Sequence, residues 1–349
     1  MKRAGFLTGG DVAPVRAAGT GMFGDVAPLF RRADASFFNL ELPLSHRGEA
    51  ARGKAICMRG LPVNIDGLAE TGVCCVNLAN NHVLDYGDVA LFDTLDLLDA
   101  KSIGRFGAGR DIHEARKGHI LERNGLRIGF LGYTTTLPTG FAATPGSPGV
   151  SPLQSYTAYQ PRASLAEYPG TAPRIVTWTD PADLQELRRH AVALRNEVDV
   201  LLIYVHWGTS MSPSVHEFQR EIAKAAIDAG AHAVFGGHQH VVSAIEFYGG
   251  CPVVYGSANL LFDTRPSFFT GETLKTFLFG ASIGPDGLSD CYLLPAETGV
   301  DVPPRLLPCR EPLWKAIYDD LQAHSSAYGT RLTARADAIE VRPDEFRES

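Results

Sequence analysis

Short hydrophobic runs that end in polar residues recur along the chain. Runs of this length, rich in Val, Ile, Leu and Phe, are typical of buried β-strands. After an opening run over residues 6–8, they cover Ala35 to Phe38, Val73 to Val76, Ile128 to Leu131, Val200 to Val205, Ala233 to Phe235 and Val253 to Tyr255. Because helical patterns lie between several of these runs, the sequence predicts an α/β fold.

Two of the intervening segments have hydrophobic residues at helical spacing. Leu91, Leu95 and Leu98 follow an i, i+4, i+7 pattern, and Gly104 lies beyond it. The second pattern consists of Val215, Phe218, Ile222 and Ala225. Each pattern predicts a helix that buries one face against the sheet.

Helix boundaries are indicated by capping residues. Ser214 and Glu217 have the spacing of a capping box, and Gly230 stands where that helix is expected to stop. The sequence Gly-Asp-Val-Ala-Pro occurs twice near the start of the chain, and Asp25 belongs to the second copy. We expect Asp25 to be an N-cap, with Pro28 in the first turn of the helix.

The alternation of predicted strands and helices is interrupted between residues 137 and 181. This insertion contains eight prolines with many Gly, Ser and Thr residues. Such long loops in compact domains are typically functional covers or disordered. Because Tyr156, Tyr159, Tyr168 and Trp178 favour packing, we predict an irregular insertion that covers the active site.

A helix is predicted over residues Pro312 to His324. It belongs to a C-terminal segment, residues 300–349, that we expect to wrap around the same domain. The whole chain, residues 1–349, is therefore predicted to form a single domain.

Composition narrows the class of protein. The chain has 349 residues, 45% of them hydrophobic and 20% charged, with a formal net charge of −7 and no basic cluster, which argues against nucleic-acid binding. The sequence has no signal-peptide pattern and no apolar run of membrane-spanning length. Its six cysteines have no CxxC spacing. We therefore expect a cytoplasmic protein with reduced thiols and no membrane association.

Residues that can bind metals follow several of the predicted strands. In α/β sheets the carboxyl ends of strands face the ligand crevice, so these residues are expected to meet there. They are Asp11, Glu41, Asn81, His82, His206, His238 and His240. Taken singly, a histidine is more often structural, Asn81 could close a turn and Asp11 could cap a helix. Their shared position favours a site for divalent transition metals.

Several longer sequence motifs of this chain resemble those of a known protein family. The Gly-Asp after the first strand and the segments NLELPL, NLANNHVLDYG, VHWG, DAGAHAVFGGHQHVVSAIEFYGGCPVVYGSANLLFD and SSAYGT closely resemble the CapA, or poly-γ-glutamate capsule-biosynthesis, family of the calcineurin-like metallophosphoesterase superfamily. The resemblance implies a four-layer α/β/β/α sandwich with a two-metal site at its edge.

The resemblance also implies which residues bind two divalent cations, expected to be Mn, Fe or Zn. One cation would be bound by Asp11, Glu41 and His240. The other would be bound by Glu41, Asn81, His206 and His238, so that Glu41 bridges the two. The superfamily has Asp-x-His where this chain has Asp11-Val12-Ala13, and an aspartate in place of Glu41. The first cation is therefore expected to be held more weakly.

By the same resemblance His82 is an acid outside the metal ligands, hydrogen-bonded to Asp85. The spacing alone allows an imidazole oriented by a carboxylate, able to protonate a leaving group, but also an Asp85 that only caps the following helix. Asn259 is expected near the site, without an assigned role.

Three functions remain open from the sequence. The first is hydrolysis of a phosphoester of a small substrate by a metal-bound hydroxide, and the second is hydrolysis or transfer at a γ-glutamyl-type amide. The third is a non-catalytic subunit of a synthase complex.

Four arginines in predicted loops could reach an anionic substrate: Arg59, Arg110, Arg162 and Arg174.

Overall fold

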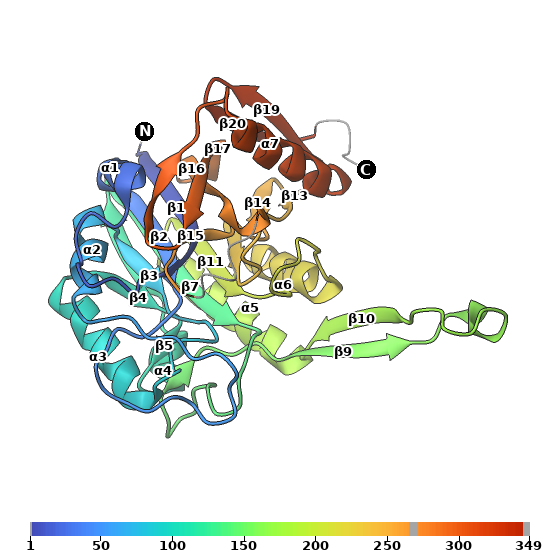
Figure 1. Ribbon diagram of the computed structural model, residues 1–349, viewed down its shortest axis with the longest axis horizontal. Coiled ribbons are helices and arrows are strands. Elements are labelled where there is room, and N and C mark those ends of the chain that lie inside the picture. Colours follow the sequence, from blue (N-terminus) through green and yellow to red (C-terminus); the bar gives the residue numbers. More distant parts are fainter. Residues whose placement is uncertain (1, 265–270, 345–349) are drawn as a thin grey trace.

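Two stacked β-sheets form the centre of the computed structural model, which describes residues 2–264 and 271–344 (Figure 1). The larger sheet has the order β19-β20-β17-β16-β1-β2-β3-β4, with β15 beside β1 and β18 beside β17. Its strands are β1 (Ala4–Ala13), β2 (Ala35–Leu40), β3 (Cys75–Asn77), β4 (Gly104–Phe106), β15 (Asn259–Phe262), β16 (Lys275–Gly284), β17 (Gly287–Gly299), β18 (Val302–Leu306), β19 (Thr330–Arg335) and β20 (Ala338–Pro343).

The smaller sheet has six strands in the order β13-β14-β12-β11-β7-β6. They are β6 (His119–Arg123), β7 (Leu126–Thr134), β11 (Val200–His206), β12 (Ala233–Gly237), β13 (Ile245–Tyr248) and β14 (Cys251–Val254). The predicted strand runs all lie in, or overlap with, strands of these two sheets, so these predictions are confirmed. The sequence analysis did not predict the long β16–β17 hairpin, which forms the middle of the larger sheet.

Helices form the outer layers. The larger sheet is covered by α1 (Ala27–Arg32), α2 (Asn64–Thr71) and α3 (Gly87–Ala100), and the smaller sheet by α5 (Pro181–Arg195) and α6 (Glu217–Asp228). The remaining helices are α4 (Ile112–Arg116), α7 (Pro312–Ser325) and the short 3₁₀ helices η1 (Gly24–Val26), η2 (Ala163–Ala166), η4 (Gly271–Leu274) and η5 (Ser326–Tyr328). The predicted four-layer α/β/β/α sandwich is confirmed. Within residues 2–264 and 271–344, none of the helices combines the length and the apolar character that crossing a bilayer requires.

An aromatic core fills the space between the two sheets. Phe37 on β2 lies at its centre, with no more than 1% of its surface exposed. Its ring centroid is between 5.5 and 6.0 Å from the centroids of five other aromatic rings, which come from both sheets. They belong to Phe6, Phe106, Phe130, Tyr204 and Phe235. The sheets are therefore held together by aromatic packing as well as by aliphatic contacts.

The predicted capping box of α6 was wrong by two residues. The helix begins at Glu217, its N-cap is His216, and the side chain of Gln219 accepts a hydrogen bond of 2.9 Å from the His216 N–H. The carbonyl of Ser214 instead accepts a hydrogen bond from Gln239. That contact ties the preceding loop to the segment after β12, so the helix starts later. The predicted stop at Gly230 fits the observed end of the helix.

The predicted N-cap role of Asp25 was also wrong. Asp25 lies inside the 3₁₀ helix η1, and α1 begins afterwards at Ala27 without a side-chain cap. Because Asp25 is part of the 3₁₀ turn, Val26 rather than Asp25 occupies the N-cap position of α1. Pro28 does occupy the first turn of α1, as predicted.

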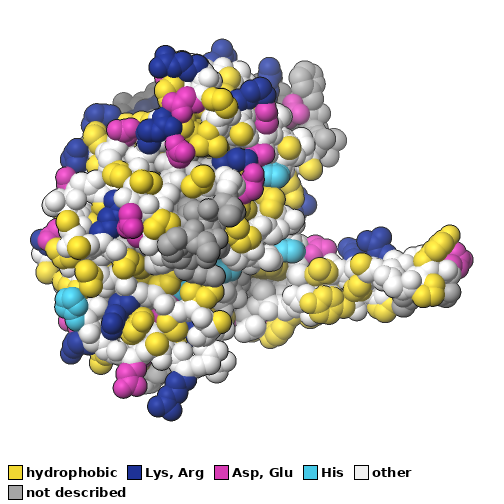
Figure 2. Space-filling view, viewed as in Figure 1, with side chains coloured by type: hydrophobic (Ala, Val, Ile, Leu, Met, Phe, Trp, Pro, Cys, Tyr) yellow, Lys and Arg dark blue, Asp and Glu magenta, His cyan; other side chains and the backbone are white. Residues whose placement is uncertain are grey.

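The insertion at residues 137–181 contains more regular structure than predicted. Within it, β9 (Ser155–Gln160) and β10 (Arg174–Thr179) form an antiparallel hairpin that extends away from the body of the molecule, and β8 (Gly149–Val150) pairs with β5 (Ala108–Gly109) (Figures 1 and 2). The rings of Tyr156 and Trp178 lie 5.7 Å apart across the hairpin. These aromatic residues thus pack on each other. That the insertion covers the active site stays a prediction.

The C-terminal segment completes the larger sheet. The predicted helix at 312–324 is confirmed as α7, and its residues Ile317 and Leu321 are fully buried. The strands β19 and β20 follow it and pair with each other, and β20 pairs with β17, where Tyr292 faces Glu340.

The central position of Phe37 predicts a large loss of stability on truncation. We expect Phe37→Ala to lower the free energy of unfolding by about 3–5 kcal/mol, because the cavity between the sheets cannot close around it. Urea denaturation followed by circular dichroism measures the change. Tyr159→Ala is the control, since that side chain is 69% exposed on the hairpin and its loss should change stability by less than about 0.5 kcal/mol. Equal effects of the two substitutions would contradict this account of the core.

Candidate metal centre

The strand register brings the candidate ligands together. Asp11 near the end of β1 faces Asn39 on β2 and, on its other side, Asn259 on β15. His206 is the last residue of β11 and faces Gly237 at the end of β12. Because these strands are parallel, their carboxyl ends lie at one edge, where the two sheets meet.

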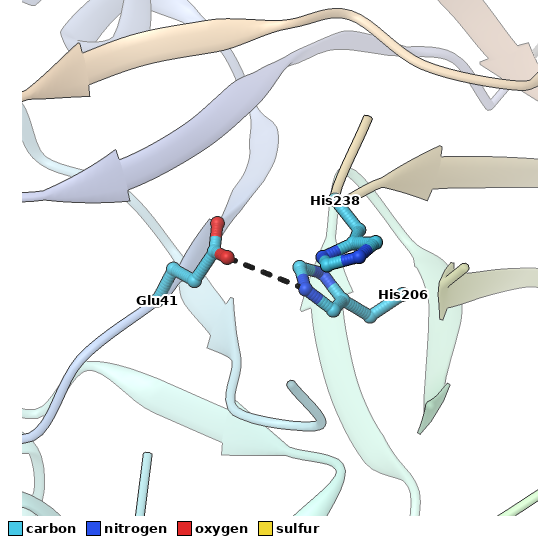
Figure 3. A group of neighbouring side chains, drawn as sticks. All are labelled: Glu41, His206 and His238. Carbon is cyan, nitrogen blue, oxygen red and sulfur yellow. Dashed lines mark ion pairs between the residues drawn. The ribbon is translucent and has the colours of Figure 1, made fainter. Parts of the chain in front are cut away.

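Glu41 lies at the centre of this edge. It follows β2, and Figure 3 shows its carboxylate facing the rings of His206 and His238. Two groups of three side chains place one potential ligand atom each within 4.8 Å of the others, and both groups contain Glu41. They are Glu41, His206 and His238, and Asp11, Glu41 and His240.

Distances within the groups are short. Glu41 Oε1 is 3.4 Å from His206 Nε2 and 3.7 Å from His240 Nε2. Asn81 Oδ1 is 2.8 Å from His206 Nε2, and Asp11 Oδ2 is 3.6 Å from His240 Nδ1. The structure therefore brings together all six side chains that the sequence analysis proposed as ligands.

Asp11 is a buried carboxylate that the protein itself satisfies. Its Oδ1 accepts hydrogen bonds from Asn39 Nδ2 at 2.9 Å and from the Tyr204 hydroxyl at 3.1 Å. Its Oδ2 accepts a hydrogen bond of 3.0 Å from the backbone N–H of His238. These donors fix the orientation of the carboxylate and provide hydrogen bonds to both of its oxygens, although it is fully buried.

Glu41 is equally buried but is not satisfied in this way. Among the described residues, neither of its carboxylate oxygens receives a hydrogen bond. Burial and the neighbouring charge of Asp11 raise the pKa of Glu41 well above its ordinary value of 4.5. An ionised Glu41 therefore needs a positive charge that the described hydrogen bonds do not provide.

The facing imidazoles are held in the neutral form. Burial lowers the pKa of His206 to about 4, and burial together with the charges of the surrounding histidines lowers the pKa of His238 well below its ordinary value. The Nδ1 atom of His238 is buried and has no hydrogen-bond partner among the described residues. Neutral imidazoles are the form that binds metal ions.

The loop that carries two of these histidines has an unusual backbone. His238 has a φ angle of 88° and His240 one of 58°, which non-glycine residues seldom adopt. A Cβ atom on the preceding Gly237 would lie 2.0 Å from the Tyr204 hydroxyl oxygen and 2.5 Å from Asp11 Oδ1, so only glycine fits there. The strained backbone aims both rings at the carboxylates, which is typical of functional sites.

These observations fit divalent cations bound at this edge. Two ligands at right angles, each about 2.1 Å from a cation, lie about 3 Å apart, which is close to several of the separations found here. The donor set combines carboxylate and amide oxygens with imidazole nitrogens, which suits Mn, Fe or Zn. The unpartnered Glu41 oxygens and His238 Nδ1 are the atoms that such cations would satisfy.

Asn39 is a supporting residue that the sequence analysis missed. Its side-chain N–H groups reach Asp11 Oδ1 at 2.9 Å and His206 Nδ1 at 3.3 Å. Its Oδ1 accepts hydrogen bonds from Asn77 and Asn80. Asn39 stands two residues before Glu41, and side chains two apart on a strand share a face, so this spacing was a usable signal.

His82 and Asp85 are adjacent, as the sequence analysis expected. His82 Nδ1 lies 2.6 Å from Asp85 Oδ2. Burial is the main reason why the pKa of His82 is lowered to about 4, against the opposing effect of Asp85. The Lys54 ammonium group contacts Asp85 Oδ1 and lies 2.9 Å from His82 Nδ1. Lys54 comes from the loop between β2 and α2, which contains no motif that could have indicated it.

The other proposed residues are placed as follows. Asn259 Oδ1 is 2.8 Å from His240 Nδ1, so it orients that ring. Arg110 and Arg174 pair with Asp96 and Glu217, and the guanidinium group of Arg59 stacks on the Tyr86 ring. Arg162 lies on the hairpin, in the turn after β9. The contacts named for Arg59, Arg110 and Arg174 do not involve the candidate ligands.

Relatives of this chain have names that refer to capsule or polymer synthesis. It is 29% identical over 261 residues to "PGA biosynthesis protein CapA" of Bacillus subtilis (strain 168), which covers 73% of this chain and 61% of that protein. It is 25% identical over 245 residues to "Capsule biosynthesis protein CapA" of Bacillus anthracis, covering 69% and 54%. The chain therefore spans only 54–61% of the length of these two relatives.

Solved structures resemble this one more distantly. The protein GAP50, "the anchor in the inner membrane complex of Plasmodium", aligns with 85% of each chain, at 10% identity and a TM-score of 0.36, a similarity too low to support any argument. The model of the family described as "Bacterial capsule synthesis protein PGA_cap", in contrast, matches residues 7–264, which is most of the chain. The chain belongs to this family.

Proposed function

We propose that this chain is a metal-dependent hydrolase that cleaves a phosphoester of a small substrate. The observation that carries the proposal is Glu41, a buried carboxylate shared by two potential ligand groups and left without a hydrogen-bond donor among the described residues. Two divalent cations would be held by the groups that meet at Glu41. One would contact Asp11, Glu41 and His240, and the other would contact Glu41, Asn81, His206 and His238.

When bound, such a pair of cations lowers the pKa of water, which makes it a nucleophile near neutral pH, and stabilises the charge that develops on the group under attack. The chain itself supplies the fixed ligands. Asn39 and Tyr204 hold Asp11 in place, and Asn259 orients His240. Because these supports are buried, the ligands need little rearrangement when cations bind.

His82 is the proposed proton donor to the leaving group. Its Nδ1 is engaged by Asp85, so Nε2 is the nitrogen that remains to face a substrate. A neighbouring carboxylate fixes the tautomer and the orientation of an imidazole, which is how an acid outside the metal ligands is positioned. Asp85 is in turn held by the Met58 N–H at 2.7 Å.

Amide hydrolysis or transfer is a second candidate, favoured by the names of the relatives. These names refer to biosynthesis of PGA and of the capsule, and, for a Mycobacterium tuberculosis relative that is 29% identical, to a "probable polyglutamine synthesis accessory protein". The same cations can stabilise the oxyanion of a carbonyl under attack, so a γ-glutamyl-type amide is a chemically reasonable substrate.

A substrate panel distinguishes these candidates. Aryl phosphates, phosphodiesters and γ-glutamyl amides are each incubated with protein supplied with Mn²⁺, Fe²⁺ or Zn²⁺. We expect turnover of a phosphoester, and we expect His82→Ala to lower kcat by about 10²–10⁴-fold while bound metal, measured by plasma mass spectrometry, stays within error. His206→Ala is the matched variant that should lower the metal content itself. Turnover of amides alone would favour the second candidate, and no turnover with any metal would favour a non-catalytic subunit.

Glu41 gives a prediction about stability and pH. Its raised pKa means that the folded protein binds more protons than the unfolded chain between pH 4.5 and the raised value. The stability that this group contributes is therefore present below pH 4.5 and is lost as the pH rises through the folded-state pKa. We expect Glu41→Gln to raise the free energy of unfolding of chelator-treated protein at neutral pH by about 1–3 kcal/mol, since no unpaired charge is then buried.

The same variant should lose the stabilisation that added cations give to the wild type. Thermal unfolding with and without Mn²⁺ measures both effects. Glu49→Gln is the control, because Glu49 is exposed and should change neither. A Glu41→Gln variant that is still stabilised by Mn²⁺ as strongly as the wild type would contradict the proposed bridging position.

A further inference from the structure

The β9–β10 hairpin presents a concentration of exposed hydrophobic side chains. It extends away from the body of the molecule, and β9 is exposed along most of its length (Figures 1 and 2). Among the described residues eleven large hydrophobic side chains are exposed, and five of them lie on this hairpin: Tyr156, Tyr159, Tyr168, Ile175 and Trp178. Such a concentration is typical of a surface that binds another molecule.

The two edges of the hairpin differ in their surroundings. The edge of β10 is held by helix α6, since the Thr177 hydroxyl donates a hydrogen bond of 2.9 Å to Glu217. The Thr179 N–H donates a second one, of 2.8 Å, to Glu221. The backbone of residues 156–160 on β9, in contrast, has no hydrogen bond outside the hairpin among the described residues. The edge of β9 therefore offers N–H and C=O groups with which another strand can pair.

β9 also lacks the features that keep strand edges from pairing. Its sequence is Ser-Tyr-Thr-Ala-Tyr-Gln, with no charged residue and no proline, and it pairs with β10 without a bulge. Charged residues on an edge strand oppose the addition of a further strand. The strands at the ends of the two main sheets, β19, β4, β6 and β13, all have them, and so has β10: Arg331, Arg105, Glu122, Glu246 and Arg174. In this comparison β9 is the unprotected edge.

We propose that β9 pairs with β9 of a second copy of this chain, so that the two hairpins form one four-stranded sheet and join the molecules as a dimer. A strand and its copy run antiparallel when the two-fold axis is perpendicular to the sheet, so β9 is its own complement. The inference does not depend on the proposed function, because the hairpin contains none of the candidate metal ligands.

Charge complementarity supports a second copy as the partner. When the axis passes near the middle of β9, the residues just after β9 in one copy lie beside residue 154 of the other. The exposed Arg162 follows β9. Two partly exposed carboxylates lie at residue 154: Asp183 accepts a hydrogen bond from the Gln154 N–H, and the backbone N–H of Asp180 donates one to the Gln154 carbonyl. Each Arg162 thus approaches the carboxylates of the other copy.

The size of the contact also favours a second copy over a short peptide. Stable interfaces bury about 1,200–2,000 Å² in total. A peptide strand on β9 would leave the tip of the hairpin, residues 161–173, uncovered, although Tyr168 at this tip is 65% exposed. In the symmetric dimer each tip extends along the other copy, so the strand contact and two tip contacts add up.

Sedimentation of the full chain tests the proposal. We expect a mass of twice 37.6 kDa above about 10 µM. Thr157→Lys adds a charge to an exposed position in the middle of β9, and the two lysines of a dimer would lie close together across the axis. We expect this variant to raise the dissociation constant of the dimer about tenfold. Val192→Lys is the matched control, because Val192 is 50% exposed on α5, and it should leave the constant unchanged. A monomer at about 100 µM, or equal effects of the two substitutions, would overturn the proposal.

Cross-linking tests the position of the axis. Thr157→Cys and Ala158→Cys place a thiol at the middle of β9, where residues at the axis face their own copies with Cβ atoms about 4.5–5.5 Å apart. With copper phenanthroline as oxidant, we expect at least one of the two variants to form a disulfide-linked dimer. The wild type, in which Cys309 is exposed, and Val192→Cys should remain largely unlinked. A dimer that neither β9 cysteine links, or that Val192→Cys links equally well, would show that the contact lies elsewhere and would overturn the proposal.

Discussion

Two carboxylates buried side by side impose the constraint on which this site depends. Asp11 lies on β1, and Glu41 directly follows the neighbouring parallel strand β2. Both side chains are fully buried, so water cannot screen a charge on either of them. The Asp11 carboxylate accepts hydrogen bonds from a side-chain amide, a hydroxyl group and a backbone N–H. Glu41, in contrast, faces three imidazoles without a hydrogen-bond donor among the described residues, an arrangement that is costly for a charged carboxylate unless a cation is present.

The fold could be predicted from the sequence wherever the pattern is local. Leu91, Leu95 and Leu98 are all fully buried on α3, as the helical spacing required. The carboxyl ends of the parallel strands could be predicted as well, since a hydrophobic run followed by Asp, Glu or His marks both the strand and its functional end. The start of α6 could not, because a contact from Gln239 ties down the loop before it.

Within the site, too, residues at strand ends could be predicted from the sequence, whereas residues placed by contacts in the folded chain could not. Asp11, Glu41 and the histidines stand at strand ends, where position in the sequence determines position in space. Lys54 stands in a loop, and only the folded chain shows that it reaches Asp85. Tyr204 looks like any aromatic core residue in the sequence, although its hydroxyl group binds Asp11. The family model matches residues 7–264 and does not by itself establish an activity, since activity depends on the individual side chains of a site.

The origin of the candidate ligands on two different sheets has a consequence for folding. Asp11, Glu41 and Asn81 belong to the half of the sandwich built around β1–β3, whereas His206, His238 and His240 belong to the half built around β11 and β12. Neither half carries a complete set, so each proposed cation would gain all of its ligands only after the two halves have docked. Such an ion would join the two halves: by mass action its binding opposes their separation, and its release favours it.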